Sequence, residues 1–213
     1  MISTPPTTAS VVFNNKDLNN WTQRNGDPAT WTVADGIMTV TSGNIMTKEL
    51  FTDSRLHLEF MTPDMPEATG QSQGNSGVFL QGRYEIQVLD SYGVDVLGKG
   101  DCGAVYNQFA PLVNACKPPL EWQTYDIFFR APRCNEDNQV IDLARLTVLQ
   151  NEIVIHNNVQ LPGITGGPWS PSSTEIDQNV WEPGPLLLQD HGDPVKYRNI
   201  WIEPLSLGGS DEY

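Results

Sequence analysis

Short runs of alternating apolar and polar residues, each ended by turn residues, recur along this chain of 213 residues. A helical period of 3.6 residues is hard to find over any window of a dozen positions. The run 84–89 is the clearest example, because its three apolar positions share one face of a strand while Glu85, Gln87 and Leu89 share the other. This pattern favours β-strands throughout the chain and indicates that the second face of this strand contacts something polar.

Turn signals join these runs into hairpins. Asp35-Gly36 is a strong two-residue turn, and 18 Gly with 16 Pro favour many turns over long helices. We therefore predict an all-β protein, an antiparallel β-sandwich of jelly-roll type with roughly ten strands. The main predicted strands cover residues 31–34, 37–41, 56–60, 74–89 as a pair around Gly82, 122–130, 144–149, 152–156, 185–191 and 195–202.

Length and charge limit the domain organisation and the partners. We expect an N-terminal linker-like segment (1–10), a single jelly-roll domain (11–206) and a C-terminal tail (207–213). The net charge of −14 repels phosphate backbones and anionic lipid, so nucleic acid and membrane surfaces are poor partners, whereas a neutral sugar is compatible. The N-terminus lacks the pattern of a signal peptide, and no 18-residue apolar run predicts a membrane span. The cellular location stays open.

Two predicted strands carry candidate catalytic residues. Gln189 and His191 share one face of the run 185–191, and they could meet Glu85 and Gln87 on a single concave sheet face. A carboxyl group, an imidazole and two amides suit the binding of hydroxyl groups and the transfer of protons. The structural alternative is that Glu85 forms an ion pair and that His191 caps a turn.

In that alternative the partner of Glu85 is Arg198 or Arg130. His57 is predicted to face solvent or the groove without a role, and His156 to end a strand as a turn residue. No histidine pair has zinc spacing and no acidic cluster has a calcium-loop pattern, so no cofactor is predicted, although a divalent metal stays open.

Cysteines and loop tryptophans leave alternatives open. Cys102 and Cys116 could form a bridge or stay free thiols, and Cys134 is left over in either case. Trp169 and Trp181 could stack on a sugar ring or plug the ends of the sandwich.

An ordered set of motifs resembles the 3-keto-disaccharide hydrolase domain family, a branch of the concanavalin A-like lectin and glucanase jelly rolls. The resemblance runs from about residue 13 to residue 205. The motifs are GNSGVF (74–79), YEIQVLD (84–90), AP (110–111), NACKP (114–118), EWQTYDI (121–127), RLTV (145–148), HNNV (156–159), GPLLLQDHG (184–192) and VKYRNI (195–200).

The resemblance implies an enzyme that cleaves glycosides whose sugar was first oxidised at C3 by a separate sugar 3-dehydrogenase. A ketone at C3 acidifies the proton on C2, so a base can remove that proton, and the C1 substituent leaves by β-elimination before water adds. At the matching positions, Glu85 and His191 are the expected proton-transfer residues. The expected substrate-binding residues are Asn75, Gln87, Lys117, Gln189 and Arg198.

Two other functions compete with this one. A noncatalytic carbohydrate-binding module would use the same groove without chemistry. An ordinary retaining glycosidase needs two carboxylates about 5–5.5 Å apart. Position 87 is Gln, so the strand of Glu85 supplies only one carboxylate, and this third function is disfavoured.

Overall fold

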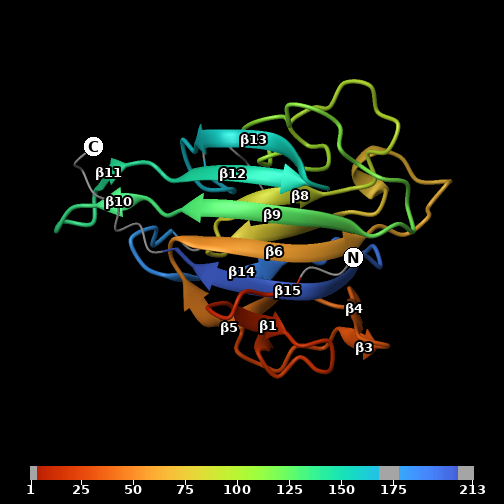
Figure 1. Ribbon diagram of the computed structural model, residues 1–213, viewed down its shortest axis with the longest axis horizontal. Helices are drawn as coiled ribbons and strands as arrows, with labels where there is room; N and C mark the ends of the chain where they lie inside the picture. Colours follow the sequence, from red (N-terminus) through yellow and green to blue (C-terminus); the bar gives the residue numbers. More distant parts are fainter. Residues whose placement is uncertain (1–3, 168–177, 206–213) are drawn as a thin grey trace.

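The computed structural model describes residues 4–167 and 178–205, which form two antiparallel β-sheets packed face to face (Figure 1). The described residues contain 15 strands and one short 3₁₀ turn, η1 (Gly70–Ser72). Figure 1 shows β9, β6 and β15 of one sheet running across β8 and β14 of the other. The protein is therefore a β-sandwich of jelly-roll type, as the sequence predicts.

The smaller sheet has five strands in the order β2-β5-β14-β7-β8. The hairpin β7–β8 is the predicted strand pair around Gly82, and β14 is inserted between β5 and β7 although it comes much later in the chain. The strand bounds are β2 (Trp21–Gln23), β5 (Ile45–Phe51), β7 (Ser76–Leu80), β8 (Tyr84–Val88) and β14 (Gly184–Leu188).

The larger sheet has eight strands in the order β13-β12-β9-β6-β15-β4-β3, with β1 paired to β15, and a small separate ribbon joins β10 to β11. The strand bounds are β1 (Ser10–Phe13), β3 (Thr32–Ala34), β4 (Ile37–Thr39), β6 (Ser54–Met61), β9 (Gln123–Arg130), β10 (Arg133–Cys134), β11 (Val140–Asp142), β12 (Arg145–Gln150), β13 (Ile153–Gln160) and β15 (Lys196–Pro204).

The hydrophobic core fills the space between the two sheets. Tyr84 of β8 packs on Phe129 of β9, with ring centroids 5.4 Å apart, so the apolar face of β8 points inward. Burial of such apolar area is the main stabilising contribution in a sandwich. Strand alternation then requires Glu85 and Gln87 to point away from the core.

The observed turns refine the predicted elements. Asp35 and Gly36 have φ of 52° and 78°, which confirms the predicted hairpin. The turn between β12 and β13 has positive φ at Asn151 and Glu152, one residue later than predicted. The predicted strand 185–191 ends early, because β14 stops at Leu188. The sequence pattern missed β1, β2, β5, β10 and β11.

In the described ranges, no helix is long and apolar enough to cross a membrane.

Candidate active site

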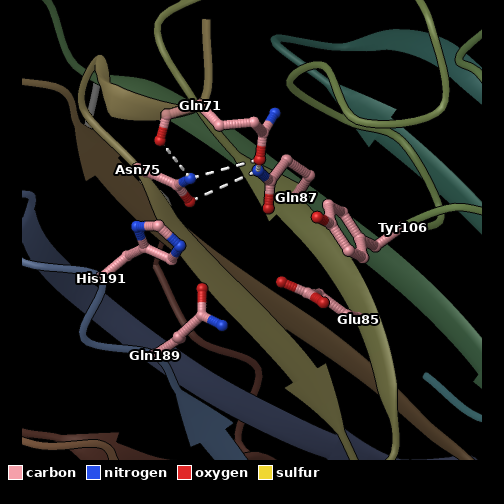
Figure 2. A pocket seen from close by; sticks show the side chains of 7 residues that line it. All are labelled: Gln71, Asn75, Glu85, Gln87, Tyr106, Gln189 and His191. Carbon is pink, nitrogen blue, oxygen red and sulfur yellow. Dashed lines mark hydrogen bonds between the residues drawn. The ribbon is translucent and has the colours of Figure 1, made fainter. Parts of the chain in front are cut away.

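The outward face of β8 forms the floor of a small polar pocket. Glu85 and Gln87 are 2% and 1% exposed, yet both line this cavity of about 40 Å³. Figure 2 shows Glu85 and His191 on opposite sides of the pocket. The lining residues are Gln71, Asn75, Glu85, Gln87, Tyr106, Gln189 and His191.

Sheet register brings the two predicted groups of polar residues together. Strand β7 pairs on one side with β8 and on the other with β14. Gly77 lies opposite Gln87, and its carbonyl accepts a hydrogen bond of 2.9 Å from the backbone N–H of Gln189. A single strand therefore separates Gln87 from Gln189. His191 follows in the loop after β14, where its side chain is exposed.

A glycine makes room for the buried carboxyl group. A Cβ atom at Gly77 would lie 2.5 Å from Glu85 Oε1 and 2.9 Å from the ring of Phe79. Contacts this short do not occur between real atoms, so any side chain at position 77 displaces Glu85 or Phe79. Gly77, the second glycine of the GNSGVF motif, is therefore required for the pocket to form.

Glu85 has no countercharge in the pocket. Its Oε2 atom is buried and makes no hydrogen bond with the described residues. Burial raises the pKa of Glu85 to about 8, because the charged form loses water and gains no partner. The ion pair that the structural alternative predicts for Glu85 is wrong, since Arg198 binds Glu59 and Arg130 binds Asp142.

Amide side chains form a hydrogen-bonded network beside the carboxyl group (Figure 2). Gln87 Nε2 donates to Asn75 Oδ1 at 3.3 Å and to Gln71 Oε1 at 3.2 Å, while Asn75 Nδ2 donates to the Gln71 carbonyl at 2.7 Å. Gln71 Nε2 donates to the carbonyl of Gly100 at 2.6 Å. Gln71 therefore links the loop before β7 to the loop after β8 across the edge of the pocket.

One atom of this network is left without a partner. Gln87 Oε1 is buried and makes no hydrogen bond with the described residues, like Glu85 Oε2. Unsatisfied buried polar atoms are costly and rare in folded proteins. Two of them facing one cavity indicate a place where a polar ligand binds.

The segment 103–106 lies along β8 as an irregular extra strand and carries Tyr106 into the pocket. Tyr106 N–H donates to the Glu85 carbonyl at 3.1 Å, and Gln87 N–H donates to the Ala104 carbonyl at 3.0 Å. The pKa of Tyr106 is raised by its partial burial and by the neighbouring Glu85.

His156 fixes the start of this segment. Its Nε2 atom lies 2.8 Å from the carbonyl oxygen of Gly103, and its side chain is 2% exposed within β13. Burial lowers the pKa of His156. The prediction that His156 ends a strand as a turn residue is therefore wrong, since it is a buried anchor of the loop that carries Tyr106.

Two predicted substrate-binding residues lie outside the pocket. Lys117 is exposed, and its Nζ donates to the carbonyl of Trp122 at 3.0 Å. Arg198 belongs to β15 in the other sheet, where it binds Glu59 and stacks 3.9 Å above the ring of Trp122. Neither residue lines the pocket. Alternation does not say which sheet the strand of Arg198 joins, and Lys117 lies in an irregular loop without any alternation.

His57 lies on the outer face of the larger sheet, away from the pocket. It is 2% exposed, stacks on Trp201 and has its Nδ1 atom 3.1 Å from Asp126 Oδ1. Its predicted place on an open face is wrong. Its predicted absence from the site agrees with the pocket lining.

The remaining candidates do not line the pocket. Cys102, Cys116 and Cys134 are free thiols, and Gln150 Nε2 lies 3.5 Å and 3.4 Å from the first two sulfur atoms. Trp181 is 42% exposed, and Trp169 lies outside the described residues. No group of three or more His, Cys, Asp or Glu suited to a metal ion occurs in residues 4–167 and 178–205.

Sequence reasoning missed Gln71 and Tyr106. Both lie in long irregular loops, where no alternation of residue types reports the direction of a side chain. The one available signal was the length of the loops themselves, since long loops in compact domains often carry function.

Comparison with known proteins assigns the chain to a family. The sequence profile of the 3-keto-alpha-glucoside-1,2-lyase-like domain matches residues 8–203. The chain belongs to this family. A comparison with curated proteins found no match.

Solved structures support the same assignment. A candidate glycosyl hydrolase from Parabacteroides distasonis ATCC 8503 is 40% identical, with a TM-score of 0.84 and with 94% of this chain and 85% of that chain covered. A second one from the same organism is 19% identical, with a TM-score of 0.67 and coverage of 93% and 94%, and it supports the fold alone. Together with the pocket, the family and the 40% identical structure support a carbohydrate-active enzyme.

Proposed function

We propose that this protein cleaves 3-keto-glycosides by β-elimination in the Glu85 pocket. The observation that carries the proposal is a buried carboxyl group whose Oε2 atom has no hydrogen-bond partner among the described residues, facing an imidazole across a cavity lined by amides. With a pKa of about 8, Glu85 is mainly protonated at neutral pH and can act as a proton donor. His191, on the opposite side, is then the candidate base.

The proposed reaction follows from the chemistry of the ketone. His191 removes the proton from C2, and the electron pair delocalises onto the C3 oxygen as an enolate. The C1–O bond then breaks, Glu85 gives its proton to the leaving oxygen, and a C1–C2 double bond remains. Water added across this double bond gives the free 3-keto sugar. The amide N–H groups of Gln87 and Asn75 already donate within the network, so Gln87 Oε1, which has no partner among the described residues, is the amide atom suited to accept from a substrate hydroxyl group.

The pocket disfavours ordinary retaining hydrolysis. Glu85 is the only carboxylate among the described lining residues, and its pKa is raised by burial alone, with no second acid contributing. A retaining glycosidase needs a nucleophilic carboxylate about 5–5.5 Å from the acid. The pocket also has room for only a few water molecules. We therefore infer that only the reacting carbons and their substituents enter it.

The test compares a 3-keto-disaccharide with its unoxidised parent and follows the release of the reducing sugar. We expect cleavage of the oxidised substrate alone. Cleavage of the parent alone, or of neither compound, would overturn the proposal. This proposal also requires a separate sugar 3-dehydrogenase that supplies the substrate.

A noncatalytic carbohydrate-binding module is the second candidate. Four of the seven lining residues are amides, which suit the binding of hydroxyl groups without any chemistry. Glu85→Gln and His191→Ala discriminate between the two, since an enzyme keeps its affinity and loses turnover. A module shows no turnover in either form.

A further inference from the structure

A second and larger cavity lies on the same face of the five-stranded sheet. Its volume is about 490 Å³, against about 40 Å³ for the Glu85 pocket. It is lined by residues of β2, β5 and β14, of the turn after β2 and of the turn between β7 and β8. These residues are Thr22, Arg24, Met46, Thr47, Lys48, Leu50, Gln81, Gly82, Pro185 and Leu187.

Strand register shows that the two cavities share one face. Cross-strand partners point to the same side of a sheet. Five partners form one continuous row across all five strands, in the order Thr22, Met46, Leu187, Phe79 and Glu85. The row begins in the second cavity and ends at the catalytic carboxyl group proposed above.

The two cavities are close neighbours along β14 and the residues just after it. Leu187 lines the second cavity, and Gln189, two positions later on the same face, lines the Glu85 pocket. Two residues of a strand span roughly 7 Å, so one small glycoside can reach both cavities. The buried side chains of Leu187 and Phe79 lie between the cavities.

The second cavity combines an apolar floor with positive charge. Met46, Leu187 and Pro185 contribute apolar atoms, and the exposed side chains of Arg24 and Lys48 bring two cations. None of its described lining residues is acidic, in a chain with 26 acidic and 12 basic residues. Neither cation forms an ion pair with a described carboxylate, and Lys48 Nζ donates to the carbonyl of Asn19 at 2.7 Å.

We propose that this cavity binds the leaving group of the substrate, and that the preferred leaving group is an aromatic ring carrying a carboxylate. The inference rests on the proposed function, because it assigns the part of the substrate that the Glu85 pocket is too small to hold. The ring buries apolar area against Met46 and Leu187, and Arg24 binds the carboxylate. A volume of this size lies in the usual range for small-molecule sites.

The test measures kcat/KM for three 3-keto-glucosides, whose leaving groups are methanol, 4-hydroxybenzoate and the methyl ester of 4-hydroxybenzoate. We expect the carboxylate to be preferred over its ester. Arg24→Ala and Lys48→Ala should each reduce this preference about two- to fivefold, the size of a partly solvated ion pair, and leave the methyl glucoside unchanged. Lys16→Ala is the matched control, since it removes an exposed cation that lines neither cavity.

The outcomes separate this inference from the proposed function. If the methyl glucoside is cleaved but the carboxylate has no advantage in the wild type, or Lys16→Ala reduces the preference as much as Arg24→Ala, the inference is wrong and the proposed function stands. If no compound is cleaved, the proposed function fails. Calorimetry with free 4-hydroxybenzoate then tests whether the second cavity binds an aromatic carboxylate. Binding that Arg24→Ala weakens supports the inference, and the absence of binding overturns it.

Discussion

Two buried glutamates, one on the outer face of each sheet, have opposite surroundings. Glu59 of β6 is 3% exposed and binds Arg198 at 2.7 Å and the Asn199 amide at 2.9 Å. Glu85 of β8 is 2% exposed, yet its Oε2 atom has no partner in the described protein. A buried acid normally needs a partner, because desolvation penalises its charge.

The difference separates an acid that serves stability, Glu59, from the acid that we propose serves chemistry, Glu85. Both carboxylate oxygens of Glu59 accept hydrogen bonds from β15, so this residue links β6 to β15 and has no oxygen left for a ligand. The bonds of Glu85 are incomplete, and its raised pKa keeps a proton on the carboxyl group near neutral pH. Four measurements test this contrast between the two glutamates.

The largest expected effect is on turnover. Glu85→Gln should lower kcat for a 3-keto-disaccharide by about 10²–10⁴-fold, because glutamine has nearly the same shape as glutamate but lacks the acidic proton. Glu59→Gln should change kcat less than twofold. Steady-state kinetics on both variants measures the contrast. Equal losses in the two variants would mean that Glu85 has no special role.

Glu85 should also make the stability of the protein depend on pH. The pKa of Glu85 is about 8 when folded and near 4.5 when unfolded, so as pH rises between these values only the unfolded chain loses its proton. Wild-type stability therefore falls across this range relative to Glu85→Gln, by at most roughly 5 kcal/mol. Chemical denaturation at pH 5 and pH 8.5 measures the difference. If the difference in unfolding free energy between the wild type and Glu85→Gln stays constant with pH, the raised pKa of Glu85 is contradicted.

On the opposite sheet, Arg198→Ala should destabilise the protein by roughly 2 kcal/mol, because it removes the cation from a buried carboxylate. The arginine side chain is 26% exposed, so the effect falls below that of a fully buried pair. Urea unfolding of this variant beside Arg198→Lys, which keeps the charge, tests the assignment. Cleavage rates should be unchanged in both, and a catalytic loss in Arg198→Ala would restore its predicted role at the site.

The smallest effect is expected at the edge of the pocket. Gln71→Ala removes the hydrogen bonds of its side chain to Gly100, Asn75 and Gln87. The pocket should open more easily, so we expect KM to change about two- to fivefold with kcat nearly constant. Gln73→Ala is a matched control, because that neighbouring amide does not line the pocket and binds Asp90. The same change of KM in both variants would argue against a specific role for Gln71.

The sequence predicted the class of fold and one wall of the pocket. Alternation in 84–89 and in 185–191 reports which side chains share a face, and those faces lie one strand apart in the sheet. Alternation does not report which sheet a strand joins, so Arg198 was assigned to the pocket although β15 lies in the other sheet. Irregular loops have no period at all, and Gln71 and Tyr106 were therefore missed.

The place of β14 has a consequence for how the protein is made. This strand lies between β5 and β7, but it is synthesised more than a hundred residues after β7. Until residues 184–188 leave the ribosome, β5 and β7 lack their shared neighbour, and both expose unpaired strand edges. A growing chain therefore carries Glu85 long before it carries Gln189 and His191. Its pocket is completed only after residues 184–191 have been synthesised, when β14 can also pair with both open edges.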